Sequence, residues 1–383
     1  MIYAIPYVLL VILLGFLAIL IEQKKEDEAF TRKITLWGIL IYFVFFAFRG
    51  FINTDWMTYY VEFDKCTWDL LFNYEMGKSR EPGFLIFMLL NKSLVPNFHF
   101  FVFTSTLLNT WLLLSFFRKY SDNLLIALVV YLVFEGFMIN ANLMRNAISL
   151  FIFLNALPSI WERRPLKYFT LCLVAFMFHF SAIVYLPMYF FLHRKLNRWV
   201  YLGIFALCLF VFIMHIPIFL KMIQATGIGG VFIDNKVEAY TSNYEAARGF
   251  GMGFIERVIT GSLIFCYYQK LQELRTENRM FINAIVMYFF ANFMFSEFAE
   301  ISNRIALLFI FSYWVLWGDL IKCFYYDRNR YLFCTFIGFY CIIKTATTNN
   351  GPIYEYDNLL FGGIKSYQER KYIFEKTFEE PEY

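Results

Sequence analysis

The chain has 383 residues, of which 60% are hydrophobic, 22% aromatic and only 17% charged. Soluble domains carry roughly a quarter charged residues, so this composition predicts an integral membrane protein. The net charge of +4 does not suggest a nucleic-acid partner, and seven cysteines without CxxC or Cys/His spacing suggest neither a disulfide framework nor a metal or other cofactor.

A bilayer core of about 30 Å is crossed by about 20 helical residues. Apolar runs of about that length occur at 2–21, 34–50, 98–117, 123–140, 142–160, 199–220, 253–268, 280–296, 302–321 and 330–347. The first run lacks a basic n-region and a small-residue cleavage site, so we interpret it as a span rather than a signal peptide. Residues 82–95 are short for a span, and residues 168–192 carry His179 and Ser181 at their centre.

Lysine and arginine clusters predict the orientation, because short cytoplasmic loops are enriched in them. The clusters lie at 24–33, 118–119, 163–167, 194–198, 270–279 and 322–330. All of them can face the cytoplasm if 82–95 does not cross and if 168–192 forms two short helices that bend back at His179–Ser181. This predicts an all-α integral membrane fold with about 11–12 transmembrane helices, some short or re-entrant, and both termini outside.

The predicted organisation is one polytopic domain over 1–348 followed by a polar tail over 349–383. Two longer loops, about 51–81 and 221–252, then lie outside, and each carries only three Lys or Arg residues. The tail is expected on the same side.

Isolated polar residues gather at span ends away from the basic clusters. They are Arg49, Asp55, Tyr59, Tyr60, Arg145, His179, Arg248, Arg257, Glu297, Glu300 and Arg304. The predicted topology places all of them on the outer face. A charge at membrane depth costs several kcal/mol unless it is paired or hydrated, so such charges tend to line functional cavities. Several guanidinium groups facing one cavity would bind a polyanion, and outside the cytoplasm we expect a lipid-linked pyrophosphate.

Each residue also has a structural interpretation. Arg49 and Arg257 could snorkel to the interface. Glu300 and Arg304 have the i,i+4 spacing of a structural pair. His179 could be a hydrogen-bonded core histidine, and Asp55 could be solvated. The predicted convergence on one face is the stronger argument, and motifs of other enzyme classes such as GxSxG, HExxH and the P-loop are absent from the sequence.

Five stretches resemble the EpsG family, within the broader Wzy-like polysaccharide polymerases. They are FRGFINTDWMTYY (48–60), REPGF (80–84), NLMRNAISLFIF (142–153), FHFSAIVYLP (178–187) and SNRIALLF (302–309). Their order and spacing match the family over about 270 residues. The chain departs from it at Asn146 and Trp56, where the family often has Gln and Tyr.

The resemblance implies a glycosyltransferase of the GT-C type in the bacterial plasma membrane, with its active site facing the exterior. It would join oligosaccharide repeat units carried on undecaprenyl pyrophosphate into capsular polysaccharide or exopolysaccharide, without a cofactor or metal. The implied partners are the lipid-linked oligosaccharide, membrane lipid, a flippase and a chain-length regulator.

This function suggests roles for the outer residues. Arginines would bind the pyrophosphate and stabilise its charge as it leaves, with Arg145, Arg304, Arg248, Arg257 and Arg49 as candidates. The proton of the acceptor hydroxyl would pass to one of four candidates, which are His179, Glu300, Glu297 and Asp55. Tyr59 and Tyr60 would stack on sugar rings.

A flippase for lipid-linked glycans is the main alternative, and a glycan ligase is another. Transporters tend to have internal repeats and charged sites at the bilayer midplane. The predicted gathering of charges at one face therefore favours an enzyme.

Overall fold

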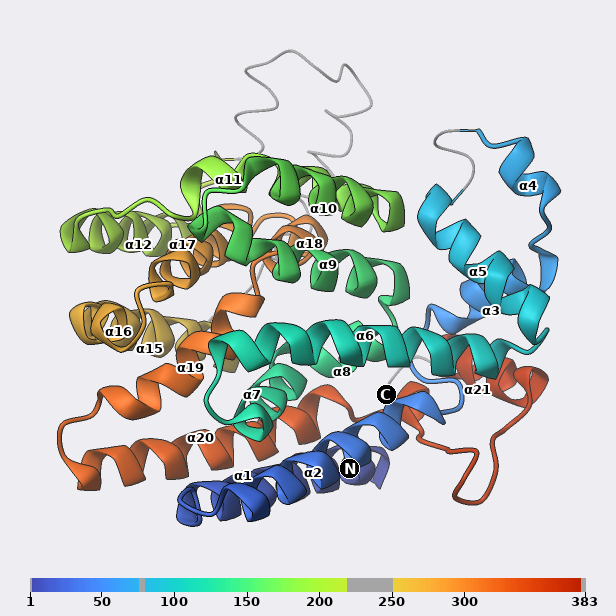
Figure 1. The fold of residues 1–383 in the computed structure, drawn as a ribbon, viewed down its shortest axis with the longest axis horizontal. Coiled ribbons are helices and arrows are strands. Elements are labelled where there is room, and N and C mark those ends of the chain that lie inside the picture. The colour runs from blue at the N-terminus through green and yellow to red at the C-terminus, as the bar shows by residue number, and fades with distance from the viewer. Residues whose placement is uncertain (1, 76–79, 219–250, 380–383) are drawn as a thin grey trace. The chain divides into compact units, whose positions relative to one another are not determined.

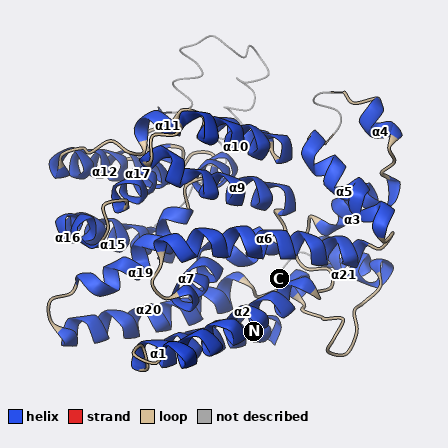
Figure 2. Ribbon diagram, viewed as in Figure 1, coloured by secondary structure: helices blue, strands red, loops and turns tan. Residues whose placement is uncertain are grey.

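The computed structural model describes residues 2–75, 80–218 and 251–379, which form helices joined by loops and contain no strand (Figures 1 and 2). The all-α fold is thus confirmed. The chain divides into two compact units, Met1–Tyr189 with Tyr326–Tyr383 (unit 1) and Phe190–Tyr325 (unit 2).

Unit 1 has a core of long helices. These are α1 (Ile5–Gln23), α2 (Glu28–Ala47), α6 (Phe98–Tyr120), α9 (Met144–Trp161), α10 (Pro165–Phe178) and α20 (Asp327–Thr348), and the short helix α7 (Leu124–Tyr131) packs among them. Helix α1 packs against α2, α7 and α20, while α6 packs against α2 and α9, and α9 against α10. The shorter helices are α3 (Trp56–Lys65), α4 (Asp69–Phe72), α5 (Pro82–Leu94), α8 (Phe137–Ala141) and α21 (Tyr367–Glu379).

Local sequence signals explain several helix starts. The side chains of Asp27, Asn97 and Asn123 accept backbone N–H groups at the first turns of α2, α6 and α7. Helices α5 and α10 begin with Pro82 and Pro165, whose fixed φ suits the first helical position.

Fewer helices qualify as membrane spans on their own than the eleven or twelve expected. Five of the described helical stretches are long and apolar enough, namely Ile2–Gln23, Glu28–Ala47, Phe98–Tyr120, Leu124–Ala141 and Asp327–Thr348. A sixth arises if α18 (Ala299–Leu307) and α19 (Phe311–Cys323), which are bent by 64°, count as one broken span. Other apolar stretches form shorter helices, including α5 and α10.

The bend expected at His179–Ser181 is present. Helix α10 ends at Phe178, His179 is extended with φ −156° and ψ 128°, and a 3-10 helix follows over Phe180–Tyr185. The Tyr168 hydroxyl donates to the Tyr185 carbonyl at 2.6 Å, so the chain after His179 returns beside the first turn of α10. Residues 168–185 therefore form a hairpin.

The two ends of α6 contact different parts of unit 1. Helix α6 has 23 residues and is roughly 34 Å long. At its C-terminal end Lys119 Nζ lies 3.6 Å from Glu162 Oε1, and the basic segments 118–119 and 163–167 meet there. At its N-terminal end the Phe98 ring packs against Tyr60, in the first of the five motifs.

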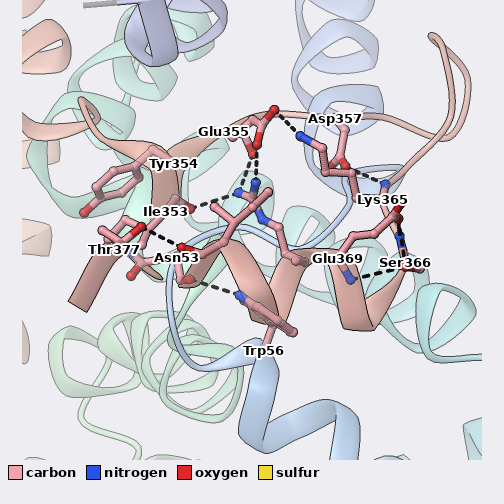
Figure 3. A network of polar contacts seen from close by, with 12 residues as sticks. Asn53, Trp56, Ile353, Tyr354, Glu355, Asp357, Lys365, Ser366, Glu369 and Thr377 are labelled. Atoms are coloured by element: carbon pink, nitrogen blue, oxygen red, sulfur yellow. Dashed lines mark hydrogen bonds and ion pairs between the residues drawn. The ribbon is translucent and has the colours of Figure 1, made fainter. Parts of the chain in front are cut away.

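The tail packs onto the loop before α3. Gly50 N donates to Asp357 O at 3.0 Å, Asn53 N to Ile353 O at 2.9 Å, and Leu359 N to Phe48 O at 2.8 Å. Figure 3 shows the polar network that continues this contact into α21. Within it Arg370, only 2% exposed, donates to Glu355 Oε2 at 2.9 Å and to the Glu355 carbonyl at 2.6 Å.

Unit 2 is built around α17 (Asn278–Met294), which packs against α12 (Arg198–Ile213), α18 and α19. Helix α15 (Met252–Cys266) contacts α12 and α19, and α16 (Tyr268–Leu274) contacts α19. Asn283 on α17 anchors the preceding loop, because its amide donates to the carbonyls of Leu192 at 2.7 Å and Arg194 at 2.8 Å.

Candidate functional site

A buried ion pair joins Glu81 to Arg145 in unit 1. Glu81 is the N-cap residue of α5 and Arg145 is the second residue of α9. Arg145 Nη1 lies 2.5 Å from Glu81 Oε2, and the two side chains are 18% and 4% exposed. Charges this buried persist only when paired, so each partner holds the other in place.

Tyr59 on α3 contacts the same arginine. Arg145 Nε donates to the Tyr59 hydroxyl at 3.5 Å, and its Cζ lies 6.0 Å from the centre of the ring. Tyr59 is 4% exposed, so its role here is to pack beside the guanidinium group. Burial raises the pKa of Tyr59, although the charge of Arg145 and its hydrogen bond lower it in part.

A glycine allows α5 to approach the end of α10. A Cβ atom on Gly83 would lie 2.8 Å from the carbonyl oxygen of Met177, which is closer than real Cβ contacts. The approach brings Glu81 beside the hairpin, where the Phe180 N–H donates to Glu81 Oε1 at 3.4 Å. The absence of a side chain at Gly83 therefore allows the Glu81 carboxylate to lie beside the hairpin.

His179 lies at the same hairpin. Its Nδ1 accepts the Ser181 N–H at 3.2 Å and lies 2.7 Å from Ser181 Oγ. When Nδ1 accepts a backbone N–H, a neutral imidazole carries its hydrogen on Nε2. In this conformation His179 can donate from Nε2.

Asn142 ties the Arg145 segment to Asp55. Its Oδ1 accepts the Asp55 N–H at 2.7 Å, and the N–H and hydroxyl of Thr54, each at 3.2 Å. Because Asn142 precedes Arg145 by three residues, these bonds fix the start of α3 relative to the start of α9. Asp55, Tyr59, Glu81, Arg145 and His179 thus come from four of the five motifs and form one cluster, which we call the Glu81–Arg145 site.

A second ion pair borders the site. Arg80 Nε donates to Glu62 Oε1 on α3 at 2.7 Å. Two consecutive residues of the REPGF motif therefore pair with two different helices, Arg80 with α3 and Glu81 with α9.

The surroundings of Glu81 favour its charged form. Burial raises the pKa of Glu81, but its backbone hydrogen bond, the charge and hydrogen bond of Arg145, and His179 lower it, so that the net pKa lies below the ordinary 4.5. Glu81 is therefore ionised at neutral pH and is a weak proton acceptor. Among the described residues no group of three or more His, Cys, Asp or Glu is placed to hold a metal ion.

Arg49 and Tyr60 lie close by with other partners. Arg49 is 4% exposed, and its Nη2 donates to the carbonyls of Asn140 at 2.7 Å and Ala141 at 3.3 Å. The guanidinium group thus supports the backbone of α8 in this structure. The Tyr60 ring stacks on Tyr367 of α21, with ring centres 4.4 Å apart.

The other predicted residues belong to unit 2, except that Arg248 lies outside the described residues. Arg304 Nε pairs with Glu300 Oε1 at 2.8 Å, and the side chains are 78% and 73% exposed, as in a surface i,i+4 pair. Glu297 is half-buried in the turn before α18.

Arg257 on α15 lines a cavity of about 200 Å³ in unit 2. Its Nε donates to the Tyr288 hydroxyl at 3.2 Å. The remaining lining residues are Phe212, Gly251, Gly253, Phe254, Asn292 and Phe293. The cavity thus combines one guanidinium group with three phenylalanine rings.

Glu81, Arg80 and Asn142 are not among the site residues predicted from the sequence. The sequence did contain a pattern that indicates Arg80 and Glu81, because the REPGF motif places these adjacent basic and acidic residues directly before a helix that begins with proline. Their partners could not be recognised, since Glu81 and Arg145 are 64 positions apart.

Comparison with protein families gives one match. The model of the EpsG family matches residues 33–358, which include all five motifs. No curated protein and no solved structure matches the chain.

Proposed function

The chain belongs to the EpsG family, and from this premise we propose that it polymerises oligosaccharide repeat units carried on undecaprenyl pyrophosphate into capsular polysaccharide or exopolysaccharide. The family supports a polysaccharide polymerase in general terms. The proposal that the substrate is carried on undecaprenyl pyrophosphate rests on the buried Glu81–Arg145 pair, at which four motifs meet.

Arg145 is the proposed pyrophosphate ligand. In the reaction the acceptor hydroxyl oxygen bonds to the anomeric carbon of the donor sugar, and the bond from that carbon to the pyrophosphate oxygen breaks. Negative charge grows on the leaving pyrophosphate, and a guanidinium group held in one orientation in a buried site stabilises that charge. Glu81 and Tyr59 hold that group in one orientation before the substrate binds.

Asp55 is the proposed proton acceptor among the four candidates. It stands at the N-terminus of α3 and is fixed relative to Arg145 through Asn142. His179 presents a donor at Nε2 in this conformation, so we assign it to hydrogen bonding with a substrate oxygen. The candidates Glu297 and Glu300 belong to unit 2.

The position of the basic segments 118–119 and 163–167 supports an outward-facing site. Basic segments meet at one end of α6 and the motif cluster lies at the other. Since basic loops favour the cytoplasm, the Glu81–Arg145 site would face the exterior of the plasma membrane.

A double substitution separates binding from support of the fold. Arg145→Gln or Glu81→Gln alone leaves a buried charge without its partner, at a cost of about 3–5 kcal/mol, whereas the double variant removes both charges. We expect the double variant to recover stability and to remain at least about 10²-fold less active, as for loss of a donor to a developing anion. Polymer yield per folded protein and thermal unfolding are the measurements.

Lys371→Ala is the matched control, because Lys371 forms an exposed pair with Glu375 on α21. Recovery of normal polymer in the double variant would show that Arg145 only supports the fold. Single repeat units should accumulate outside the membrane in the inactive strain. Accumulation inside would instead indicate a flippase.

A further inference from the structure

A groove of about 530 Å³ lies between α3 and the start of α21, within unit 1. It is lined by Tyr60, Val61, Asp64, Lys65, Ser366, Tyr367 and Gln368. Asp64, Lys65, Ser366 and Gln368 are exposed, so the groove is open to solvent. Its volume falls within the range of roughly 300–1,000 Å³ that is typical of small-molecule sites.

The wall of the groove is built by packing between two distant segments. Tyr367 stacks on Tyr60 at 4.4 Å and packs edge-on against Trp56 at 5.5 Å. Ser366, which is labelled in Figure 3, has its N–H and hydroxyl bound to Glu369 Oε2 at 2.8 and 2.7 Å, and this fixes the first turn of α21. The aromatic pair is thus held in place before any ligand binds.

The lining has the chemistry of a saccharide site. It combines two tyrosines with one carboxylate, one ammonium, one hydroxyl and one amide, which together offer many donors and acceptors with no net charge. A neutral ligand rich in hydroxyl groups satisfies such a set, whereas a polyanion would meet Asp64. We propose that this groove binds a saccharide segment of the glycan substrate, an inference that rests on the proposed polymerase function.

The groove and the Glu81–Arg145 site share one helix. On α3, Tyr59 faces Arg145, while Tyr60, Val61, Asp64 and Lys65 lie at helical spacing along the face that lines the groove. Lys92 of α5 donates to the carbonyls of Asp64 at 2.6 Å and Cys66 at 3.0 Å, so the end of α3 is anchored. A glycan in the groove would therefore lie along α3, the helix that also positions Arg145, the residue proposed to bind the pyrophosphate.

Direct binding to the purified full chain tests the groove. The probe is the repeat-unit oligosaccharide released from its lipid by mild acid, with inorganic pyrophosphate as a second probe. The double variant Asp64→Ala/Gln368→Ala removes two exposed polar groups without disturbing the aromatic pair. We expect it to bind the oligosaccharide at least about tenfold more weakly, to bind pyrophosphate normally and to make shorter chains.

Tyr372→Ala is the matched control, because Tyr372 lies on α21 and is 65% exposed outside the groove. If Asp64→Ala/Gln368→Ala binds the oligosaccharide with wild-type affinity, the proposal that the groove binds a saccharide is wrong. This outcome is independent of the polymerase proposal, which fails instead if the double variant at Glu81 and Arg145 makes normal polymer.

Discussion

Glu81 and Arg145 illustrate how much a single contact can fix in a membrane protein. Removing both groups from water is costly, so the pair adds little net stability, but loss of one partner strands the other charge. The pair also connects the N-termini of α5 and α9, whose positions are set by different parts of the sequence. Its contribution is therefore to orientation more than to stability.

The stability of the protein should depend on pH through Glu81. Because the pKa of Glu81 is lowered in the folded state, its contribution is complete above the ordinary value of 4.5 and is lost as the pH falls through the folded pKa. The unfolding temperature of the wild type should fall more steeply below about pH 4.5 than the unfolding temperature of Glu81→Gln. Parallel curves for the two proteins would contradict this assignment.

Arg304 should behave differently from Arg145. Its pair with Glu300 lies on the surface, so Arg304→Ala is expected to change the free energy of unfolding by less than about 0.5 kcal/mol. We expect its effect on polymer yield to be smaller than that of Arg145→Gln, because Arg145 is buried and held in one orientation by Glu81 and Tyr59, whereas Arg304 is exposed. An equal loss of activity at unchanged stability would place Arg304 among the essential substrate contacts.

At the scale of helices, short and broken elements build the site. Helix α5 has 13 residues, α3 has 10, and α10 stops at the bend at His179. Helix ends leave backbone groups and polar side chains near one another, which a continuous span cannot do. The Glu81–Arg145 site is accordingly made from the starts of α3, α5 and α9 and the end of α10.

Gly83→Ala tests the approach of α5 to α10. The added methyl group would meet the Met177 backbone, so α5 must shift, and we expect a loss of about 1–3 kcal/mol in stability together with reduced polymer. Gly15→Ala in α1 is the control, because a Cβ atom there has no neighbour within 4 Å. Equal unfolding temperatures for the two variants would argue against a close contact at Gly83.

For unit 1 as a whole, the tail is part of the fold and packs on the loop before α3. Backbone hydrogen bonds from Gly50 to Asp357 and from Asn53 to Ile353 form this contact. We expect the loop and the tail to share one side of the membrane, and we predict that this side is the exterior.

Cysteine labelling in whole cells tests the exterior assignment. In a background with Cys266 and Cys334 replaced by Ser, Lys371→Cys on α21 should react with an impermeant reagent added outside. Arg163→Cys, in the basic segment between α9 and α10, should react only after the membrane is opened. The reverse pattern would place the Glu81–Arg145 site in the cytoplasm.

The sequence alone determined the membrane class, the helical fold and the break at His179, because hydropathy and helix-breaking polar residues act over a few neighbouring positions. It also indicated Arg145, Asp55 and His179. Only the tertiary structure decided that Glu81 is the partner of Arg145, that Arg304 lies on the surface and that the tail forms a groove with α3. Burial and pairing depend on which segments meet in the fold. Glu81 and Arg145 are 64 positions apart and Tyr60 and Tyr367 are 307 positions apart, so no local sequence pattern indicates either contact.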